Sequence, residues 1–203
     1  MIAMENQSDG IRIVAVVGSV RPGNYTAKTL ALVVDELEKE DHVKVDVFDP
    51  AGMDLPLPGR RSDDPEVAKL HKAMREATGV ILSTPEYHGS FSSVIKLVIE
   101  NLGFPSGLVG KPVALLGVAA GQIGAIKALE HLRSVCSHVG ALVLPGTVSV
   151  AGVQNVFDEQ GNCLDERIEK RIRSVAVHLL DYIKDNVCPR MALEAIVREQ
   201  AAV

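Results

Sequence analysis

The chain has 203 residues, of which 47% are apolar and 23% are charged, and its formal net charge is −5. This composition supports one compact core and excludes a disordered chain, while the acidic balance argues against a non-specific nucleic-acid partner. No apolar run approaches the roughly 20 residues of a membrane span, so no membrane partner is expected. The polar residues 1–10 show no secretory signal and are expected to form a disordered extension. Three widely spaced cysteines (Cys136, Cys163 and Cys188) indicate a reducing, cytoplasmic location.

The first predicted elements are a strand, a helix and a second strand. Residues 11–17 form a nearly continuous β-branched run, which is typical of a strand covered on both faces. Residues 24–40 repeat apolar side chains at helical spacing. Residues 42–48 alternate at period two, which indicates a half-exposed strand at a sheet edge. A long surface loop is expected over 51–65, which is rich in Pro, Gly and charge.

The same alternation of strands and helices continues to the end of the chain. A helix over 66–77 precedes a buried strand over 79–84, and Pro85 is expected to end that strand. The remaining predicted elements are helices over 90–102, 123–138 and 164–184, strands over 113–118 and 141–150, and a tail over 186–203 with a last short helix.

Five strands separated by helices predict an α/β fold. Right-handed crossovers make the sheet parallel and place helices on both of its faces. The second strand reads as an edge and the first as the most buried, which favours the strand order 2-1-3-4-5. We expect one domain over 11–185, with ligands bound where the order reverses, at the carboxyl ends of strands one and three.

The loop after the first strand, Gly18 to Thr26, predicts a phosphate site. Ser19, Asn24 and Thr26 offer donors beside a helix start, and Arg21 adds a guanidinium suited to phosphate. An ordinary helix cap is the alternative explanation. The loop is neither G-x-G-x-x-G nor G-x-x-x-x-G-K-[ST], which leaves a phosphomonoester cradle like the one flavodoxins use for FMN.

The loops after the third and fourth strands are candidates to meet a flat ring. In the first of them, Pro85 adds stiffness, Gly89 permits close approach and Tyr87 can border a ring, although these residue types are also usual in plain turns. In the second, glycines around a helix start (residues 119–124) expose N–H groups that can stabilise a reduced flavin. A simple strand-to-helix turn is the alternative there.

Three motifs together resemble the NAD(P)H-dependent FMN reductases, a flavodoxin-like family of flavin, quinone, azo-dye and chromate reductases. The motifs are G-S-x-R-x-x-[SN]-x-T, T-P-E-Y-x-x-S and the pair Leu132-Arg133, and the resemblance runs over 11–185. It implies FMN and NADPH or NADH as cofactors. It also implies hydride transfer to FMN and electron transfer to a small acceptor: free flavin, a quinone, an azo compound or a metal oxyanion.

The resemblance also implies roles for particular residues. It assigns to the FMN phosphate the residues Ser19, Arg21, Asn24 and Thr26, with Tyr25 beside them. It places along the edge of the ring Pro85, Glu86, Tyr87, His88 and Ser90. It places at the pyrimidine side of the ring Gly121, Gln122 and Gly124. Two positions depart from the family pattern. Ile95-Lys96-Leu97 replaces the usual L-K-N, and Asn24 replaces a commoner Ser.

No catalytic side chain is required beyond the flavin, and no metal site is expected. His88 is a candidate proton donor to a quinone, with a solvated loop histidine as the alternative. Glu86 is expected to anchor its loop, Arg133 to lie at the helix surface or a subunit contact, and His131 to be an ordinary helix residue.

The chain is expected to form a homodimer or homotetramer, because the helix over 90–102 is more apolar than one sheet face requires (Val94, Leu97, Val98 and Leu102). The alternative function is a flavodoxin-type electron carrier reduced by a partner protein. The basic residues Arg60 and Arg61 and the modest net charge weaken that alternative.

Overall fold

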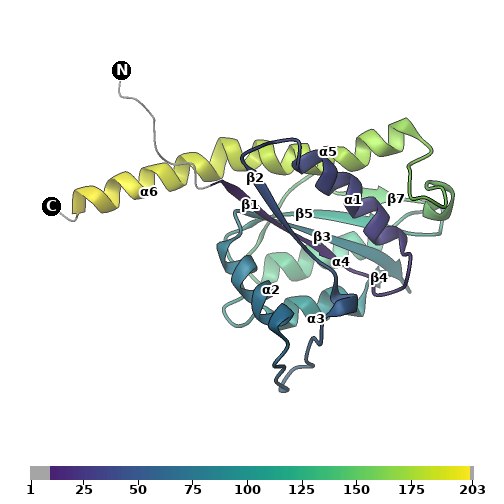
Figure 1. Cartoon of the computed structure of the whole chain (residues 1–203), viewed down its shortest axis with the longest axis horizontal. Coiled ribbons are helices and arrows are strands. Elements are labelled where there is room, and N and C mark those ends of the chain that lie inside the picture. The colour runs from purple at the N-terminus through teal and green to yellow at the C-terminus, as the bar shows by residue number, and fades with distance from the viewer. Residues whose placement is uncertain (1–9, 202–203) are drawn as a thin grey trace.

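A central sheet lies between two layers of helices in the computed structural model, which describes residues 10–201 (Figure 1). The disordered extension expected over 1–10 lies outside the described residues, apart from Gly10. The parallel strands of the sheet are β1 (Ile11–Val17), β2 (Val43–Phe48), β3 (Gly79–Tyr87), β5 (Pro112–Val118), β6 (Leu142–Val143) and β7 (Val148–Val150). Their order is β2-β1-β3-β5-β6, with β7 also paired to β5, which confirms the predicted doubly wound arrangement.

The described part of the sheet has seven strands rather than the five predicted. One addition is β4 (Ser90–Phe91), which pairs antiparallel with the end of β3. The other arises because the strand expected over 141–150 is divided into β6 and β7. Pro145 has no N–H for a ladder and Gly146 takes a φ of +77°, so this pair interrupts the strand.

The helices cover both faces of the sheet (Figure 1). Apolar side chains of α1 (Tyr25–Leu37) and α5 (Glu166–Tyr182) pack on one face. Those of α2 (Pro65–Glu76), α3 (Ser93–Asn101) and α4 (Ile126–His138) pack on the other. The strand β1 serves both cores, since Ile13 and Ala15 face the first and Val14 and Val16 the second. This two-sided burial is what its continuous apolar sequence predicts.

The expectation that Pro85 ends the third strand is wrong, because β3 continues to Tyr87. The partner strand β1 stops opposite Ser83, so β3 is open on that side beyond this point. A residue without an N–H is tolerated on an open edge, and proline itself favours extended backbone in the residue before it. The antiparallel pairing with β4 then replaces the first turn of the helix expected from residue 90, and α3 begins at Ser93.

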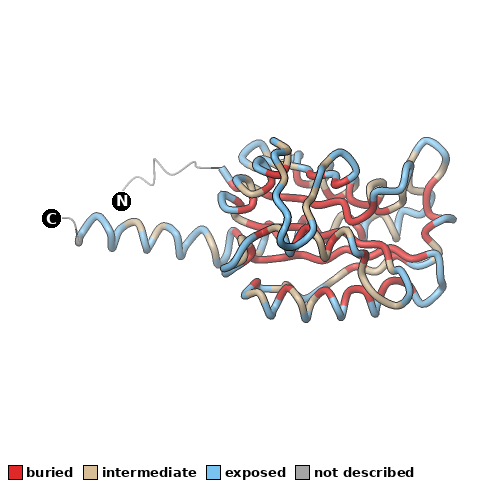
Figure 2. The backbone as a smooth tube through the Cα atoms, turned by 90° about the horizontal axis from the view of Figure 1, so that it is seen from below, coloured by how far each residue is buried: buried red, intermediate tan, exposed pale blue. Residues whose placement is uncertain are grey.

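The C-terminal segment continues α5 through a π-helical turn, η3 (Ile183–Val187), into α6 (Cys188–Ala201). Figure 2 shows α6 extending beyond the sheet with a mostly exposed surface. Two short 3₁₀ turns, η1 (Pro50–Gly52) and η2 (Val153–Asn155), complete the described chain. Among residues 10–201, no helix combines the length and the apolar character needed to cross a membrane.

Candidate active site

Three loops meet where β1, β3 and β5 end at the same edge of the sheet. They are the turn over 18–24, the β3–β4 hairpin over 85–91 and the turn over 119–125. The hydroxyl of Ser92 donates to the carbonyl of Gly18 (2.6 Å) and so joins the first loop to the second. The N–H of Gly152, just after β7, donates to the carbonyl of Gly121 (3.2 Å) and holds the third. The fold therefore gathers the loops that the sequence singled out.

The first loop leaves β1 through a position that only glycine fits. A Cβ on Gly18 would lie 2.2 Å from the carbonyl oxygen of Ser83 and 2.6 Å from Cγ1 of Ile95. The nearer atom is backbone and cannot turn aside, so a side chain here would push the loop away from β3. Gly18 thus sets how closely the first loop approaches the second.

Asn24 organises the first loop from within. Its Oδ1 accepts from the N–H of Ala27 (2.8 Å) as the cap of α1, and its Nδ2 donates to the carbonyls of Arg21 (2.8 Å) and Ser19 (3.3 Å). The hydroxyl of the buried Ser19 accepts from the N–H of Arg21 (3.4 Å). Because both ends of the Asn24 amide are engaged, this side chain shapes the loop and caps the helix at once.

Arg21 is the uncompensated charge of this corner. Its side chain is exposed, and it takes part in none of the ion pairs formed within residues 10–201. The first turn of α1 also holds no acidic residue. A free guanidinium beside a helix N-terminus attracts an anion. Tyr25 and Thr26 are turned inward: the ring of Tyr25 stacks on Phe157, with centroids 6.3 Å apart, and Thr26 is buried.

The second loop is a two-residue hairpin. Tyr87 pairs with Ser90, and the two residues between them, His88 and Gly89, have φ values of +51° and +74°. Two successive left-handed residues are typical of the tight turn that matches strand twist. Pro85 is buried, whereas Tyr87 and His88 are exposed at the tip. A ring lying across this edge would meet backbone atoms and the Tyr87 side chain.

Two side chains of the hairpin bind α4 instead of facing the edge. The Oε2 atom of Glu86 accepts from the N–H of Ala128 (3.1 Å), in the first turn of a helix whose own N-cap residue, Ala125, makes no side-chain bond. The hydroxyl of Ser90 lies 3.1 Å from Nδ1 of His131. His131 was expected to be an ordinary helix residue, and no local pattern announces this contact, since the partners are 41 positions apart.

The third loop is shaped by Ser149 of β7. The N–H of Ala125 donates to the Ser149 hydroxyl (2.8 Å). Gly124 has a φ of +78°, and a Cβ there would lie 2.3 Å from the same oxygen. Gly121 and Gln122 are exposed on the outer side of the turn. Backbone groups of this loop are therefore open to a ligand, while its base is fixed.

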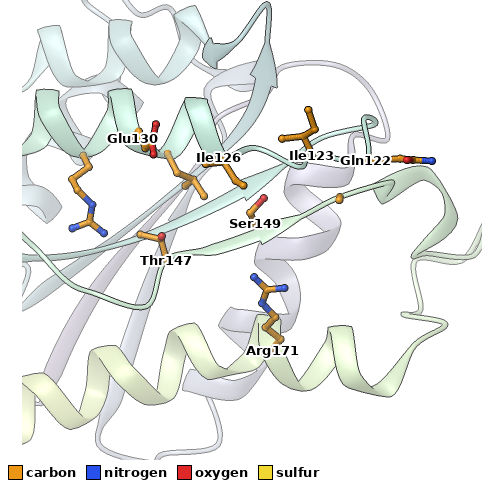
Figure 3. A pocket seen from close by; sticks show the side chains of 10 residues that line it. Gln122, Ile123, Ile126, Glu130, Thr147, Ser149 and Arg171 are labelled. Atoms are coloured by element: carbon orange, nitrogen blue, oxygen red, sulfur yellow. The ribbon is translucent and has the colours of Figure 1, made fainter.

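A cavity of about 460 Å³ adjoins the third loop (Figure 3). It lies between α4 and α5, above the edge strand β7, with Ile126 and Arg171 on opposite walls. Its lining is completed by Gln122, Ile123, Leu129, Glu130, Arg133, Thr147, Ser149 and Ala151. The guanidinium of Arg133 donates to the carbonyls of Val143 (3.3 Å) and Leu144 (3.1 Å), so this side chain ties α4 to the segment around β6.

The charged and polar groups at this edge suit a phosphorylated flat ligand. Within residues 10–201, no three His, Cys, Asp or Glu side chains gather as metal ligands. The first loop offers a guanidinium and a helix start to an anion, and the other two offer backbone groups and one aromatic ring to a planar system. FMN has both parts, so the residues present fit it.

Comparisons with known proteins show the family of the chain. The family model described as NADPH-dependent FMN reductase matches residues 11–155. An NAD(P)H-dependent FMN reductase of Pseudomonas aeruginosa is 30% identical over 176 residues, which are 82% of the chain and 91% of that protein. A 2-hydroxy-1,4-benzoquinone reductase of a Burkholderia species is 29% identical over 86% of the chain and 97% of its own length. The flavoenzyme NAD(P)H:(acceptor) oxidoreductase of Paracoccus denitrificans shares the fold, with a TM-score of 0.70 at 23% identity, over 86% of the chain and 98% of that structure.

Proposed function

The chain belongs to the NADPH-dependent FMN reductase family, and on this premise we propose how its three loops serve the reaction. The protein is an FMN-dependent oxidoreductase that takes a hydride from NAD(P)H and passes electrons to a small acceptor of the quinone, azo or free-flavin kind. When bound, FMN supplies the redox chemistry, and the protein contributes binding and orientation.

The FMN phosphate binds at the start of α1. The observation that carries this assignment is Arg21, a guanidinium without an ion-pair partner in the described chain, beside a helix start without acidic residues. Arg21 holds the phosphate through charge-assisted hydrogen bonds, together with N–H groups of the loop. Ser19 and Thr26, which the resemblance also assigns to the phosphate, are buried, so they support the start of α1 from the inside. Asn24 contributes by holding the loop in shape, since its amide is already engaged.

The flat ring lies against the hairpin and the third loop. Backbone atoms of residues 85–88 and the exposed Tyr87 ring border it on one side. The exposed Gly121 and Gln122 approach its pyrimidine side, where N–H dipoles stabilise negative charge. The buried Gly124 supports this turn, since its N–H donates to the carbonyl of Gly121 (3.2 Å). Glu86 and Ser90 support this edge from behind through α4. The exposed His88 at the hairpin tip is the candidate donor of the proton that a reduced quinone takes up.

We further propose that the protein works in the cytoplasm as a homodimer or homotetramer. The apolar sequence of the helix over 90–102 supports this less than expected, because Val98 and Leu102 are buried in the protein's own core. Other exposed apolar side chains support the proposal, since Phe104 and Ile123 are 103% and 80% exposed and the exposed Ile126 lines the same cavity as Ile123. Sedimentation at several concentrations tests it: a species larger than the 21.7 kDa monomer is expected, and a monomer throughout would contradict it.

The absorption spectrum of the FMN-loaded protein tests the proposed activity. NADPH added without oxygen is expected to bleach the flavin band, and a quinone added next is expected to restore it. A band that stays unchanged with both NADPH and NADH, but bleaches with a reducing partner protein, would contradict the proposal and favour an electron carrier. A protein that never takes up FMN would contradict both.

A further inference from the structure

The tip of the β3–β4 hairpin carries backbone strain. His88 is the non-glycine residue with positive φ in the described chain, at +51°, and Gly89 follows at +74°. A non-glycine residue in this region costs conformational energy, so it persists where surrounding contacts over-determine it. The contacts that hold this tip therefore determine where its residues lie.

Both strands of the hairpin are fastened to α4, one on each side of the tip. Before the tip, the Glu86 carboxylate accepts from the N–H of Ala128 (3.1 Å). After the tip, the Ser90 hydroxyl lies 3.1 Å from Nδ1 of His131. Ala128 and His131 are about one helical turn apart, so the N-terminal half of α4 binds both strands. The hairpin tip projects beyond these two attachments.

We propose that His131 is a positioning residue: through Ser90 it fixes the hairpin and so sets where residues 87–89 meet the flavin and the incoming nicotinamide or acceptor. This inference rests on the proposed function. The Nδ1 atom of His131 accepts from the Ser90 hydroxyl when it carries no proton, and it donates to the Ser90 oxygen when it carries one. A bond to Ser90 is therefore available in every tautomer of the ring.

The hairpin bonds should therefore affect the rate of hydride transfer, whereas the first loop determines how tightly FMN is bound. The phosphate corner at residues 18–24 makes its bonds without α4. Hydride transfer needs the two rings in contact, and a displacement of about 1 Å can cost up to about 100-fold in rate. Loosening the hairpin therefore slows hydride transfer much more than it weakens FMN binding.

The test compares His131→Ala, His131→Asn and His138→Ala. The Asn amide can replace Nδ1 as the partner of Ser90, and His138 is an exposed histidine in the last turn of the same helix. We expect His131→Ala to slow anaerobic flavin reduction by NADPH about tenfold while the Kd for FMN changes less than about threefold. His131→Asn should recover most of the rate, and His138→Ala should match the wild type.

A second readout needs no cofactor. In apo protein, amide hydrogen exchange over residues 87–91 should be faster in His131→Ala than in the wild type and restored in His131→Asn. A thermodynamic cycle with Ser90→Ala should show coupling, because each single variant removes the same bond. These two measurements stand even if NADPH is not oxidised at all, so failure of the proposed function can be told apart from failure of this inference.

The inference is overturned by either of two results. One is an His131→Ala variant with wild-type hydride transfer and wild-type exchange over residues 87–91. The other is a variant in which FMN affinity, melting temperature and rate all fall together and His131→Asn rescues none of them, which is the signature of a merely structural residue.

Discussion

The first loop and the ring-facing hairpin are stabilised in opposite ways. The hydrogen bonds of Ser19 and Asn24 in the first loop join residues two to five positions apart, and the Gly18 carbonyl accepts from the distant Ser92. The bonds that hold the hairpin reach 41 and 42 positions along the chain to α4. The phosphate corner is thus a local motif, whereas the ring edge depends on the position of a helix from the other half of the protein.

This difference separates two properties of the active site. Changes in the first loop should act on how tightly FMN is held, and changes at the hairpin should act on how fast it is reduced. The two regions touch at Gly18, whose carbonyl accepts from Ser92 at the start of α3. The variants that follow test whether FMN affinity and reduction rate depend on different regions.

The largest effect is expected from Gly18→Ala, which disturbs both regions together. Its Cβ would meet the Ser83 carbonyl oxygen at 2.2 Å, so we expect a loss of more than about 3 kcal/mol and a Tm lower by about 10 °C. Thermal unfolding with and without FMN measures this. Gly52→Ala is the control, since its Cβ meets nothing within 4 Å. An unchanged Tm for Gly18→Ala would show that the loop does not need its close approach to β3.

Arg21→Ala should have the next largest effect, and it should change FMN binding alone. Removing a charge-assisted contact of about 1.5–3 kcal/mol lowers FMN affinity by about 10- to 100-fold. The Tm of the apo protein should stay unchanged, because Arg21 makes no ion pair within residues 10–201. Fluorescence titration with FMN measures the change, and Arg190→Ala on α6 is the control. Equal losses in both variants would point to a general charge effect.

Glu86→Ala should show the reverse pattern. The variant removes the acceptor for the Ala128 N–H and with it the cap of α4, which costs about 1 kcal/mol. We expect flavin reduction by NADPH to slow about three- to tenfold, with FMN affinity nearly unchanged. Glu199→Ala, which removes an exposed glutamate of α6, is the control. A Glu86→Ala variant that loses FMN but reduces it at full speed would reverse the assignment of the two regions.

Asn24→Ala should have the smallest effect. It removes a helix cap worth about 1 kcal/mol, which lowers Tm by about 2–4 °C, and it loosens the loop so that FMN affinity falls a few-fold. Asn24→Asp tests the placement of the phosphate, because a carboxylate still caps α1 but repels the phosphate. A carboxylate cannot donate to the carbonyls of Arg21 and Ser19 as Nδ2 does, so the Tm should fall at least as far as in Asn24→Ala, and FMN affinity should fall further. Tighter FMN binding by Asn24→Asp would contradict the placement of the phosphate.

The contrast between the regions also explains how far the sequence predicted them. The strand order and the first loop follow from local patterns: a β-branched run, a Gly-Ser-x-Arg turn and an Asn cap within 14 residues. The hairpin does not, because the extension of β3 through Pro85 depends on where β1 stops and on the pairing with β4. His131 was missed for the same reason, since its role comes from packing between α4 and β4.

The C-terminal helix shows the same limit. The sequence indicated a break near residue 185, whereas α5, η3 and α6 follow one another directly. Pro189 lacks the N–H that would bond four residues back, and its ring crowds the Asp185 carbonyl. The wider π turn over Ile183–Val187 takes up that crowding, so the chain stays helical. The sequence around Pro189 indicates that the regular helix is interrupted there, but it does not predict that a π turn keeps the chain helical.

The central claim is that Arg21 and the start of α1 hold the phosphate of FMN, and comparing FMN with riboflavin tests it most directly. Titrations of the wild type should give a Kd for FMN at least about 100-fold lower than for riboflavin, which lacks the phosphate. In Arg21→Ala this ratio should fall by about tenfold or more, with riboflavin affinity unchanged. Equal affinities for the two flavins in the wild type, or a ratio that survives in Arg21→Ala, would contradict the account.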